Sequence, residues 1–244
     1  TELLVDVYQR EQDWHKALNV GTAANVSASV DLAQRLSHFC CELAEQVLQL
    51  NEHQECLAYL KRAKRHNADN PRVSFLRAQL SMQQDNYTDA KRHLLMMCQQ
   101  DVQLVPEIIQ PLQLCFTKLS DIEGWRSWLS QTMSQHPSTS LLLAQAHEIG
   151  QQNDSDAAAY VTEKLRQRPS LKGFNYLIDL HMQWASDNAK DSLQVLKGLT
   201  VALQNSKPQY RCRQCGFAGN SMHWQCPSCH QWDSTKPIYG LEGE

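Results

Sequence analysis

The chain has 244 residues, 42% of them hydrophobic, and a formal net charge of -3. Lys and Arg are scattered among Asp and Glu, which excludes a strongly basic nucleic-acid-binding protein. No apolar stretch approaches the roughly 18 to 20 residues that a membrane-spanning helix needs, and no signal-peptide pattern opens the chain, so we expect it to be soluble.

Helix-forming residues dominate most of the sequence. Glycine and proline are sparse, with 9 and 8 copies, and alternating β-branched or aromatic runs are missing from most of the length. The sequence therefore predicts an all-α protein. Five cysteines lie inside helical pattern, where free thiols behave as small buried side chains, and this usage indicates a reducing compartment. They are Cys40, Cys41, Cys56, Cys98 and Cys115.

A spacing of 34 residues relates two neighbouring stretches of the chain. Small residue Ala44 corresponds to Ala78, and Cys56 corresponds to Ala90. The other matching pairs are Asn51-Glu52 with Asp85-Asn86, Leu60 with Leu94, and Ala63 with Met97. This period is typical of tetratricopeptide repeats, in which two helices cross at small side chains. We therefore predict a tetratricopeptide-type solenoid over residues 1–206, with an irregular helical bundle as the alternative.

Partial copies of the pattern occur before and after these two units. Their turn and packing residues are Asp13-Trp14 with Ala17 and Ala24, Gly124-Trp125, and Asp156 with Ala158. Two further helical stretches are predicted at roughly 171–184 and 189–204. Cys56 and Trp128 stand where alanine is usual, so no unit keeps the full pattern.

One run of basic residues stands out against the scattered charges elsewhere. It comprises Lys61, Arg62, Lys64, Arg65 and His66. We interpret it as the solvated C-terminal end of a helix, where the helix dipole stabilises cations.

Stacked helical pairs leave a concave surface that is lined by the first helix of each pair and suited to binding another polypeptide. We expect this surface to be the working part of the repeats. Five side chains face either this groove or water, and we favour water for each of them. They are Tyr8, Arg35, His38, Arg77 and Gln84.

The composition changes abruptly after Lys207-Pro208, where short aromatic segments and turn residues replace helical periodicity. This change predicts a second domain over residues 207–244. Its centre is two Cys-x2-Cys pairs separated by ten residues, which can direct four thiolates at one zinc or iron ion. The candidate metal ligands are Cys212, Cys215, Cys226 and Cys229.

Neighbouring residues support a metal site that is closed to catalysis. Gly216 permits a positive φ after the first pair, and Pro227 presets the turn in the second. His223 and His230 could replace a cysteine, but four cysteines already complete a structural site, so we expect both to be bystanders. The expected core is formed by Tyr210, Phe217, Trp224 and Trp232.

Three segments of this domain resemble the rubredoxin-type tail of the lipopolysaccharide assembly protein B family. They begin at Tyr210 (YRCRQCGF), Trp224 (WQCPSC) and Lys236 (KPIYGLEG). The helical repeats before them follow that family's order. Carried over residue by residue, the resemblance assigns the four cysteines as metal ligands and Gly216 and Pro227 as supporting positions. His230 stands where related turns often have glycine.

The resemblance implies an inner-membrane protein of Gram-negative bacteria, held by an N-terminal anchor that this chain lacks, with its repeats on the cytoplasmic side. It implies an adaptor that binds the lipid A pathway deacetylase LpxC and presents it to the membrane protease FtsH, which restrains lipopolysaccharide synthesis. It leaves open whether the chain also binds a lipopolysaccharide-sensing membrane partner and whether it forms a homodimer.

The alternative function is electron transfer, because rubredoxins carry iron in the same ligand set. An enzyme is not expected, and no catalytic residue is assigned. The sequence has no glycine-rich phosphate loop, no G-x-S-x-G elbow and no H-E-x-x-H helix. No nucleic-acid partner is expected either, because residues 208–244 carry no basic excess.

Overall fold

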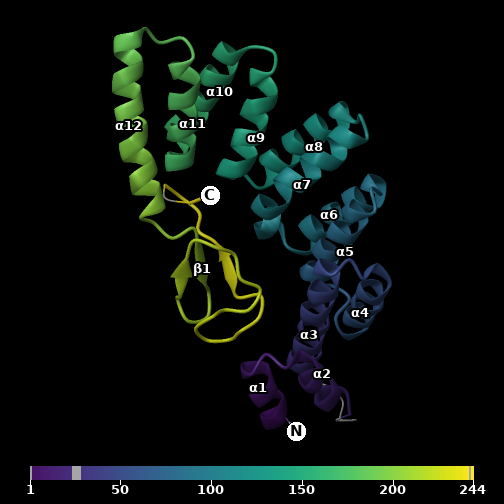
Figure 1. The fold of residues 1–244 in the computed structure, drawn as a ribbon. Helices are drawn as coiled ribbons and strands as arrows, with labels where there is room; N and C mark the ends of the chain where they lie inside the picture. The colour runs from purple at the N-terminus through teal and green to yellow at the C-terminus, as the bar shows by residue number, and fades with distance from the viewer. Residues whose placement is uncertain (1, 24–28, 242) are drawn as a thin grey trace. The chain divides into compact units, whose positions relative to one another are not determined.

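The computed structural model describes residues 2–23, 29–241 and 243–244, so the predicted packing residue Ala24 lies outside the described residues. Within these ranges the chain forms twelve α-helices, one short 3-10 helix and three β-strands (Figure 1). The helices are α1 (Glu2–Arg10), α2 (Trp14–Ala23), α3 (Val30–Gln49), α4 (His53–His66), α5 (Pro71–Gln83), α6 (Tyr87–Gln100), η1 (Val102–Leu104), α7 (Val105–Lys118), α8 (Ile122–Gln135), α9 (Thr139–Gly150), α10 (Asp154–Gln167), α11 (Leu171–Met182) and α12 (Asp187–Asn205). The strands are β1 (Tyr210–Cys212), β2 (Ala218–Gly219) and β3 (Thr235–Pro237). None of these helices has the length and apolar character that crossing a membrane requires.

The chain divides into two compact units. Unit 1 comprises Thr1–Val102 and Leu114–Leu119, and unit 2 comprises Gln103–Gln113 and Ser120–Glu244. Helix α7 therefore begins in unit 2 and ends in unit 1. The cysteine-rich segment belongs to the same unit as helices α8 to α12, so it is packed on helical repeats rather than isolated from them.

Four interhelical turns share one backbone feature. Gln12, Asn51, Asp85 and Ser120 adopt positive φ angles of 58°, 60°, 55° and 55°. Each lies two residues before the second helix of its pair, α2, α4, α6 or α8. Asn51 and Asp85 are 34 residues apart, so the turn that was expected from the period recurs at the expected distance. The predicted all-α fold of tetratricopeptide type is confirmed.

Small side chains lie where the two helices of a pair cross. Ala44 in α3 and Ala78 in α5 are both fully buried, as are Cys56 in α4 and Ala90 in α6. A small side chain at a crossing lets the two helix backbones approach closely. The residues matched across the 34-residue period therefore have the same structural role.

The predicted turns of the later units are displaced by about one helical turn. Gly124 and Asp156 lie inside the first turns of α8 and α10 rather than before them. Asp121 and Asn153 cap these helices, and each side chain accepts a hydrogen bond from a main-chain N–H of the first turn. Such caps typically contribute about 1 kcal/mol each.

The sequence pattern places Trp128 where alanine is usual, but the structure puts Trp125 there. Trp125 is the fourth residue of α8, as Cys56 is of α4, so Trp125 occupies the helix-crossing position that Cys56 has in its helix. Trp125 is 2% exposed, and its Nε1 donates a hydrogen bond to Glu148 Oε1 at 3.0 Å. Trp128 instead stacks on it, with ring centroids 5.5 Å apart. A large aromatic pair fills this crossing where alanine is usual.

The expectation that His38 faces water is wrong, because its side chain is fully buried. Arg35 is partly buried and donates hydrogen bonds to Asp6 Oδ1 at 2.5 Å and Gln9 Oε1 at 3.0 Å. Gln84 is exposed, as expected. Side chains on the first helix of a pair also contact the preceding pair, so their burial depends on stacking that periodicity alone does not describe.

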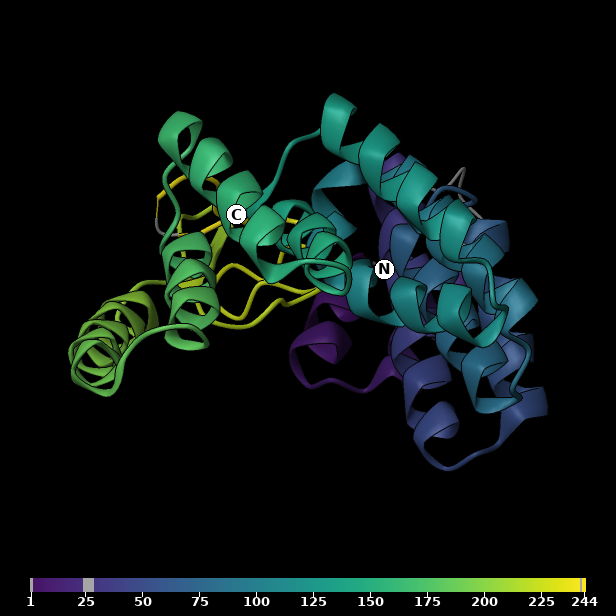
Figure 2. The same ribbon diagram turned by 90° about the horizontal axis from the view of Figure 1, so that it is seen from above.

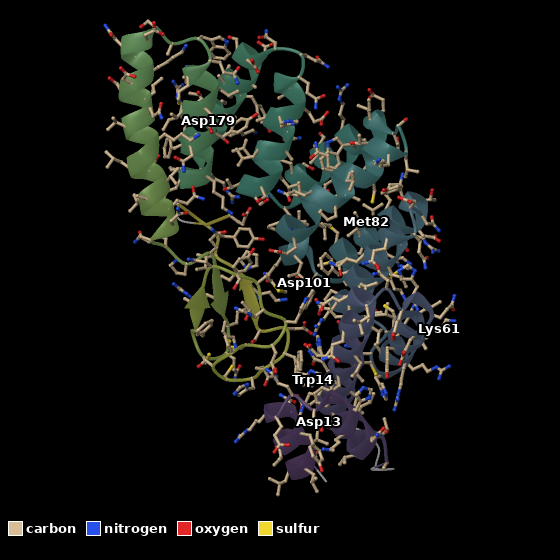
Figure 3. The ribbon with its side chains drawn as sticks, viewed as in Figure 1. Asp13, Trp14, Lys61, Met82, Asp101 and Asp179 are labelled. Carbon is tan, nitrogen blue, oxygen red and sulfur yellow. The ribbon has the colours of Figure 1, made fainter. Side chains whose placement is uncertain are left out.

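Helix α12 is attached to α11 through polar contacts. Figures 1 and 2 show the two helices side by side. Asn175 Nδ2 donates to Gln204 Oε1 at 2.7 Å, and Lys197 forms an ion pair with Asp179, which Figure 3 labels. None of the residues of α12 is buried. Docking of this helix therefore depends on side-chain hydrogen bonds more than on an apolar core.

Candidate metal centre

The three short strands form a sheet that holds the cysteine turns at its edge. Their order is β2-β1-β3, and both pairings are antiparallel. Tyr210 pairs with Gly219 on one side and with Pro237 on the other. Strand β1 ends at Cys212, so the first ligand position is fixed at the end of the central strand.

The four predicted ligand residues come together in space. The sulfur atoms of Cys212, Cys215, Cys226 and Cys229 all lie within 4.8 Å of one another. Cys212 Sγ is 3.7 Å from Cys229 Sγ, and Cys215 Sγ is 3.6 Å from Cys226 Sγ. A tetrahedron of thiolates around zinc, with Zn–S bonds of about 2.3 Å, has sulfur atoms about 3.8 Å apart. The arrangement therefore fits one metal ion held by four sulfur atoms.

The first cysteine turn is closed by main-chain hydrogen bonds. The Cys212 N–H donates to Phe217 O at 2.7 Å, and the Gly216 N–H donates to Cys212 O at 3.0 Å. Gly216 has a φ of 79°, which is the conformation expected for it from the sequence. The Cys215 N–H also approaches Cys212 Sγ at 3.5 Å. Such N–H groups favour a negatively charged sulfur and orient it as a ligand.

The second cysteine turn repeats this pattern. The Cys226 N–H donates to Gln231 O at 2.9 Å, and the His230 N–H donates to Cys226 O at 2.9 Å. His230 adopts a φ of 58°, in the same left-handed region as Gly216. The histidine in place of the glycine usual in related turns therefore leaves the geometry of the turn intact.

Hydrogen bonds favour thiolate at the first pair. Burial opposes ionisation of Cys212, but its hydrogen bond with Ser234 and those with main-chain N–H groups lower its pKa to about 6. A main-chain hydrogen bond from Phe217 lowers the pKa of Cys215. Burial raises the pKa of Cys229 to about 12, and the neighbouring sulfur atoms contribute to this rise. A dication supplies the positive charge that allows all four sulfur atoms to ionise together.

The metal-ligating group in the described part of the chain contains the four cysteines and neither nearby histidine. His223 Nε2 lies 3.0 Å from Ser221 Oγ, and its ring lies edge-on to Phe217 with centroids 6.5 Å apart. The His230 side chain is exposed. Neither histidine therefore lies with the four sulfur atoms, and that both are bystanders stays a prediction.

The predicted aromatic core is only partly enclosed within the module. Trp232 is 4% exposed, whereas Tyr210, Phe217 and Trp224 are partly buried. Tyr210 reaches outside the module, because its hydroxyl donates a hydrogen bond to Glu107 Oε1 of α7 at 2.5 Å. Burial and this carboxylate raise the pKa of Tyr210. The module is thus fastened to a helix of the repeats by the first residue of β1.

The segment after β3 makes a second attachment, which the sequence did not predict. Glu244 Oε2 accepts a hydrogen bond from the Ser140 N–H of α9 at 2.9 Å, and Glu244 Oε1 pairs with Lys172 of α11 at 2.6 Å. The Leu171 N–H donates to Leu241 O at 2.9 Å. A carboxylate at the beginning of a helix is stabilised by the unpaired N–H groups there. Glu242, within the KPIYGLEG segment, lies outside the described residues.

Comparison with known proteins agrees with this architecture. The family model of a rubredoxin metal binding domain matches residues 210–237. Lipopolysaccharide assembly protein B of Escherichia coli (strain K12) is 31% identical over 242 residues, which is 98% of this chain. The protein of that name from Haemophilus influenzae is 28% identical over 243 residues, or 99% of this chain. The resemblance to the lipopolysaccharide assembly protein B family is confirmed.

The chain spans about 62% of the length of the Escherichia coli protein and 61% of the Haemophilus influenzae protein. Among solved structures, a thermophilic TPR protein of Thermus thermophilus aligns with 68% of this chain and 99% of its own, at a TM-score of 0.39 and 13% identity. The similarity to the family covers the repeats as well as the metal module, since the aligned region is nearly the whole chain.

Proposed function

We propose that the chain is a non-catalytic adaptor in the control of lipopolysaccharide synthesis. In this proposal it binds the deacetylase LpxC and promotes its proteolysis by the membrane protease FtsH. The observation that carries the proposal is the 31% identity to lipopolysaccharide assembly protein B over 98% of the chain. Tandem helical pairs support a binding role, because such repeats present extended surfaces to other polypeptides.

The proposed metal ligands are Cys212, Cys215, Cys226 and Cys229, which hold one zinc or iron ion. Four sulfur ligands complete a tetrahedral shell and leave no coordination position for a substrate, which supports a structural role. The proposed domain boundary lies between residues 206 and 207, with repeats before it and the rubredoxin-like module after it. The hydrogen bonds of Tyr210 and Glu244 to the helices support a module that acts together with the repeats.

The proposed location is the cytoplasmic face of the bacterial inner membrane, with the anchor supplied by a part of the protein outside this chain. This location would place the repeats beside a membrane protease. Co-sedimentation of the full-length protein with inner-membrane vesicles, compared with this chain alone, tests the location.

The decisive experiment is a calorimetric titration of purified LpxC into the metal-loaded chain. We expect saturable binding, and we expect FtsH to degrade LpxC faster when the full-length protein is present. Failure of the metal-loaded chain to bind either LpxC or FtsH would overturn the proposal. Metal analysis of the same sample distinguishes a structural role of the site from electron transfer, because zinc has no redox chemistry and a colourless zinc protein cannot transfer electrons through this site.

A further inference from the structure

Ser234 lies between the two cysteine turns of the metal module. Its carbonyl accepts a hydrogen bond from the Arg213 N–H at 2.8 Å, directly after the first ligand position in the chain. Its Oγ lies 3.2 Å from Cys212 Sγ and donates a hydrogen bond to Gln231 O at 3.0 Å. The same Gln231 carbonyl accepts a hydrogen bond from the Cys226 N–H at 2.9 Å. One side-chain hydroxyl therefore contacts a ligand sulfur of the first turn and a carbonyl that closes the second turn.

The Ser234 hydroxyl has one proton and two neighbours that can accept it. When Cys212 is a thiol, its S–H can donate to Ser234 Oγ while the hydroxyl donates to Gln231 O. A sulfur that binds a metal is a thiolate and has no proton. The contact between Oγ and Sγ is then a hydrogen bond only if the hydroxyl donates to the sulfur. Gln231 O keeps the Cys226 N–H as a donor, so this reorientation leaves the carbonyl paired.

The Cys212 sulfur has little access to water. Cys212 is 1% exposed and Ser234 is 9% exposed, whereas Cys215 is exposed. A charged sulfur that water does not reach must be stabilised by hydrogen-bond donors of the protein. A hydroxyl that donates to a charged acceptor forms a hydrogen bond about twice as strong as one between neutral groups. Ser234 therefore supplies such a donor at the less accessible of these two sulfur atoms.

The neighbouring residue shows that burial of a hydroxyl does not by itself produce this contact. Thr235 is 1% exposed and pairs with Cys212 in the register of β1 and β3. Its Oγ1 is buried and has no hydrogen-bond partner among the described residues. Two buried hydroxyl groups thus follow one another in the chain, and it is the Ser234 hydroxyl that contacts a ligand sulfur.

We propose that Ser234 is a positioning residue of the metal centre, whose hydroxyl donates a hydrogen bond to Cys212 Sγ when the four cysteines hold an ion. This hydrogen bond stabilises the negative charge of the thiolate and fixes the direction of the sulfur. Groups that orient a ligand in this way typically change metal affinity by about 10- to 100-fold. The inference rests on the proposed four-cysteine site and applies to zinc and iron alike, because the same sulfur atoms bind either metal.

The test compares Ser234→Thr with Ser234→Val in the full chain. The two new side chains have the same shape and differ by a hydroxyl in place of a methyl group. Thr235→Val is the matched control, because it removes the adjacent buried hydroxyl that has no partner. Competition with a chromophoric chelator measures the zinc affinity, and loading with Co²⁺ gives the thiolate-to-cobalt charge-transfer bands. Circular dichroism checks that the helices persist.

We expect Ser234→Val to bind zinc about tenfold more weakly than the unmodified chain. Ser234→Thr and Thr235→Val should remain within about twofold of it, because both keep a hydroxyl at position 234. A thiolate that loses a hydrogen bond gives up electron density more easily, so the charge-transfer bands of Ser234→Val should move to longer wavelength. Those of the other two variants should stay in place.

Equal zinc affinities and equal cobalt bands of Ser234→Val and Ser234→Thr would overturn the proposal. If neither of these variants held a metal, the branched side chains would not fit, and Ser234→Ala would decide. Cobalt bands of Ser234→Ala at the unmodified wavelength would then reject the hydrogen bond, and bands at longer wavelength would support it. Failure of the unmodified chain to bind zinc or cobalt would instead overturn the metal site itself.

Discussion

His230 and Gly216 occupy equivalent left-handed backbone positions in the two cysteine turns, with φ angles of 58° and 79°. Each N–H donates to the carbonyl of the first cysteine in its turn, at 2.9 Å for His230 and 3.0 Å for Gly216. The left-handed region is unfavourable for a residue with a Cβ atom and neutral for glycine. The module therefore tolerates one strained residue in an otherwise repeated turn.

Single substitutions of His230 and Gly216 should change the stability of the metal-loaded module in opposite directions. His230→Gly should stabilise the metal-loaded module by about 0.5 to 1 kcal/mol. Gly216→Ala should destabilise it by about 1 to 2 kcal/mol. A Cβ at Gly216 would meet no atom within 4 Å, so the loss comes from the backbone alone. Thermal unfolding of both metal-loaded variants measures the effect, and a stabilising Gly216→Ala would contradict this account.

Cys226→Ser should abolish metal binding and unfold the module while the helices persist. Cys226 is fully buried among the sulfur atoms, and a module of this size depends on its metal for folding. Metal content should fall to near zero with little loss of helical circular dichroism. The matched control is Cys98→Ser, because burial raises the pKa of that α6 thiol and keeps it protonated. Retention of the metal by Cys226→Ser would remove this residue from the ligand set.

Gly243→Ala should detach the segment that follows β3. A Cβ at this position would lie 1.8 Å from Ile238 O, which no small adjustment can relieve. The Glu244 N–H bond to Ile238 O and the contact of Glu244 with Lys172 should then be lost. Hydrogen exchange of the amides of Gly240 and Glu244 should become faster. Gly198→Ala is the control, since its Cβ would meet nothing within 4 Å, and unchanged exchange in Gly243→Ala would disprove the tight packing.

Arg72→Ala should strongly destabilise unit 1. The Arg72 side chain is 2% exposed and pairs with Glu42 and Glu45 of α3. Removing one partner from a buried ion pair typically costs about 3 to 5 kcal/mol. The two carboxylates are partly solvated here, so we expect the free energy of unfolding to fall by about 2 to 3 kcal/mol. Urea unfolding measures the loss, and Arg65→Ala, at an exposed position in α4, should change stability by less than about 0.5 kcal/mol.

Local sequence spacing was sufficient to predict the helical class, the 34-residue period and the convergence of the four cysteines. These features depend on residues a few positions apart, whose geometry is set by turns and by helical periodicity. The boundaries of the later turns were predicted less well. Gly124 resembles a turn residue, but Asp121 begins the helix earlier, because its side chain caps the first turn.

Only the tertiary structure decided which polar residues meet across the stack. Ser140 and Glu244 are 104 residues apart, and Tyr210 and Glu107 are 103 apart, yet each pair is hydrogen-bonded. The burial of His38 and of Arg77 Nε likewise follows from the packing of neighbouring helices. The helical pattern identifies the apolar stripe of each helix, but the partner of a polar side chain depends on how successive pairs stack, which no local spacing encodes.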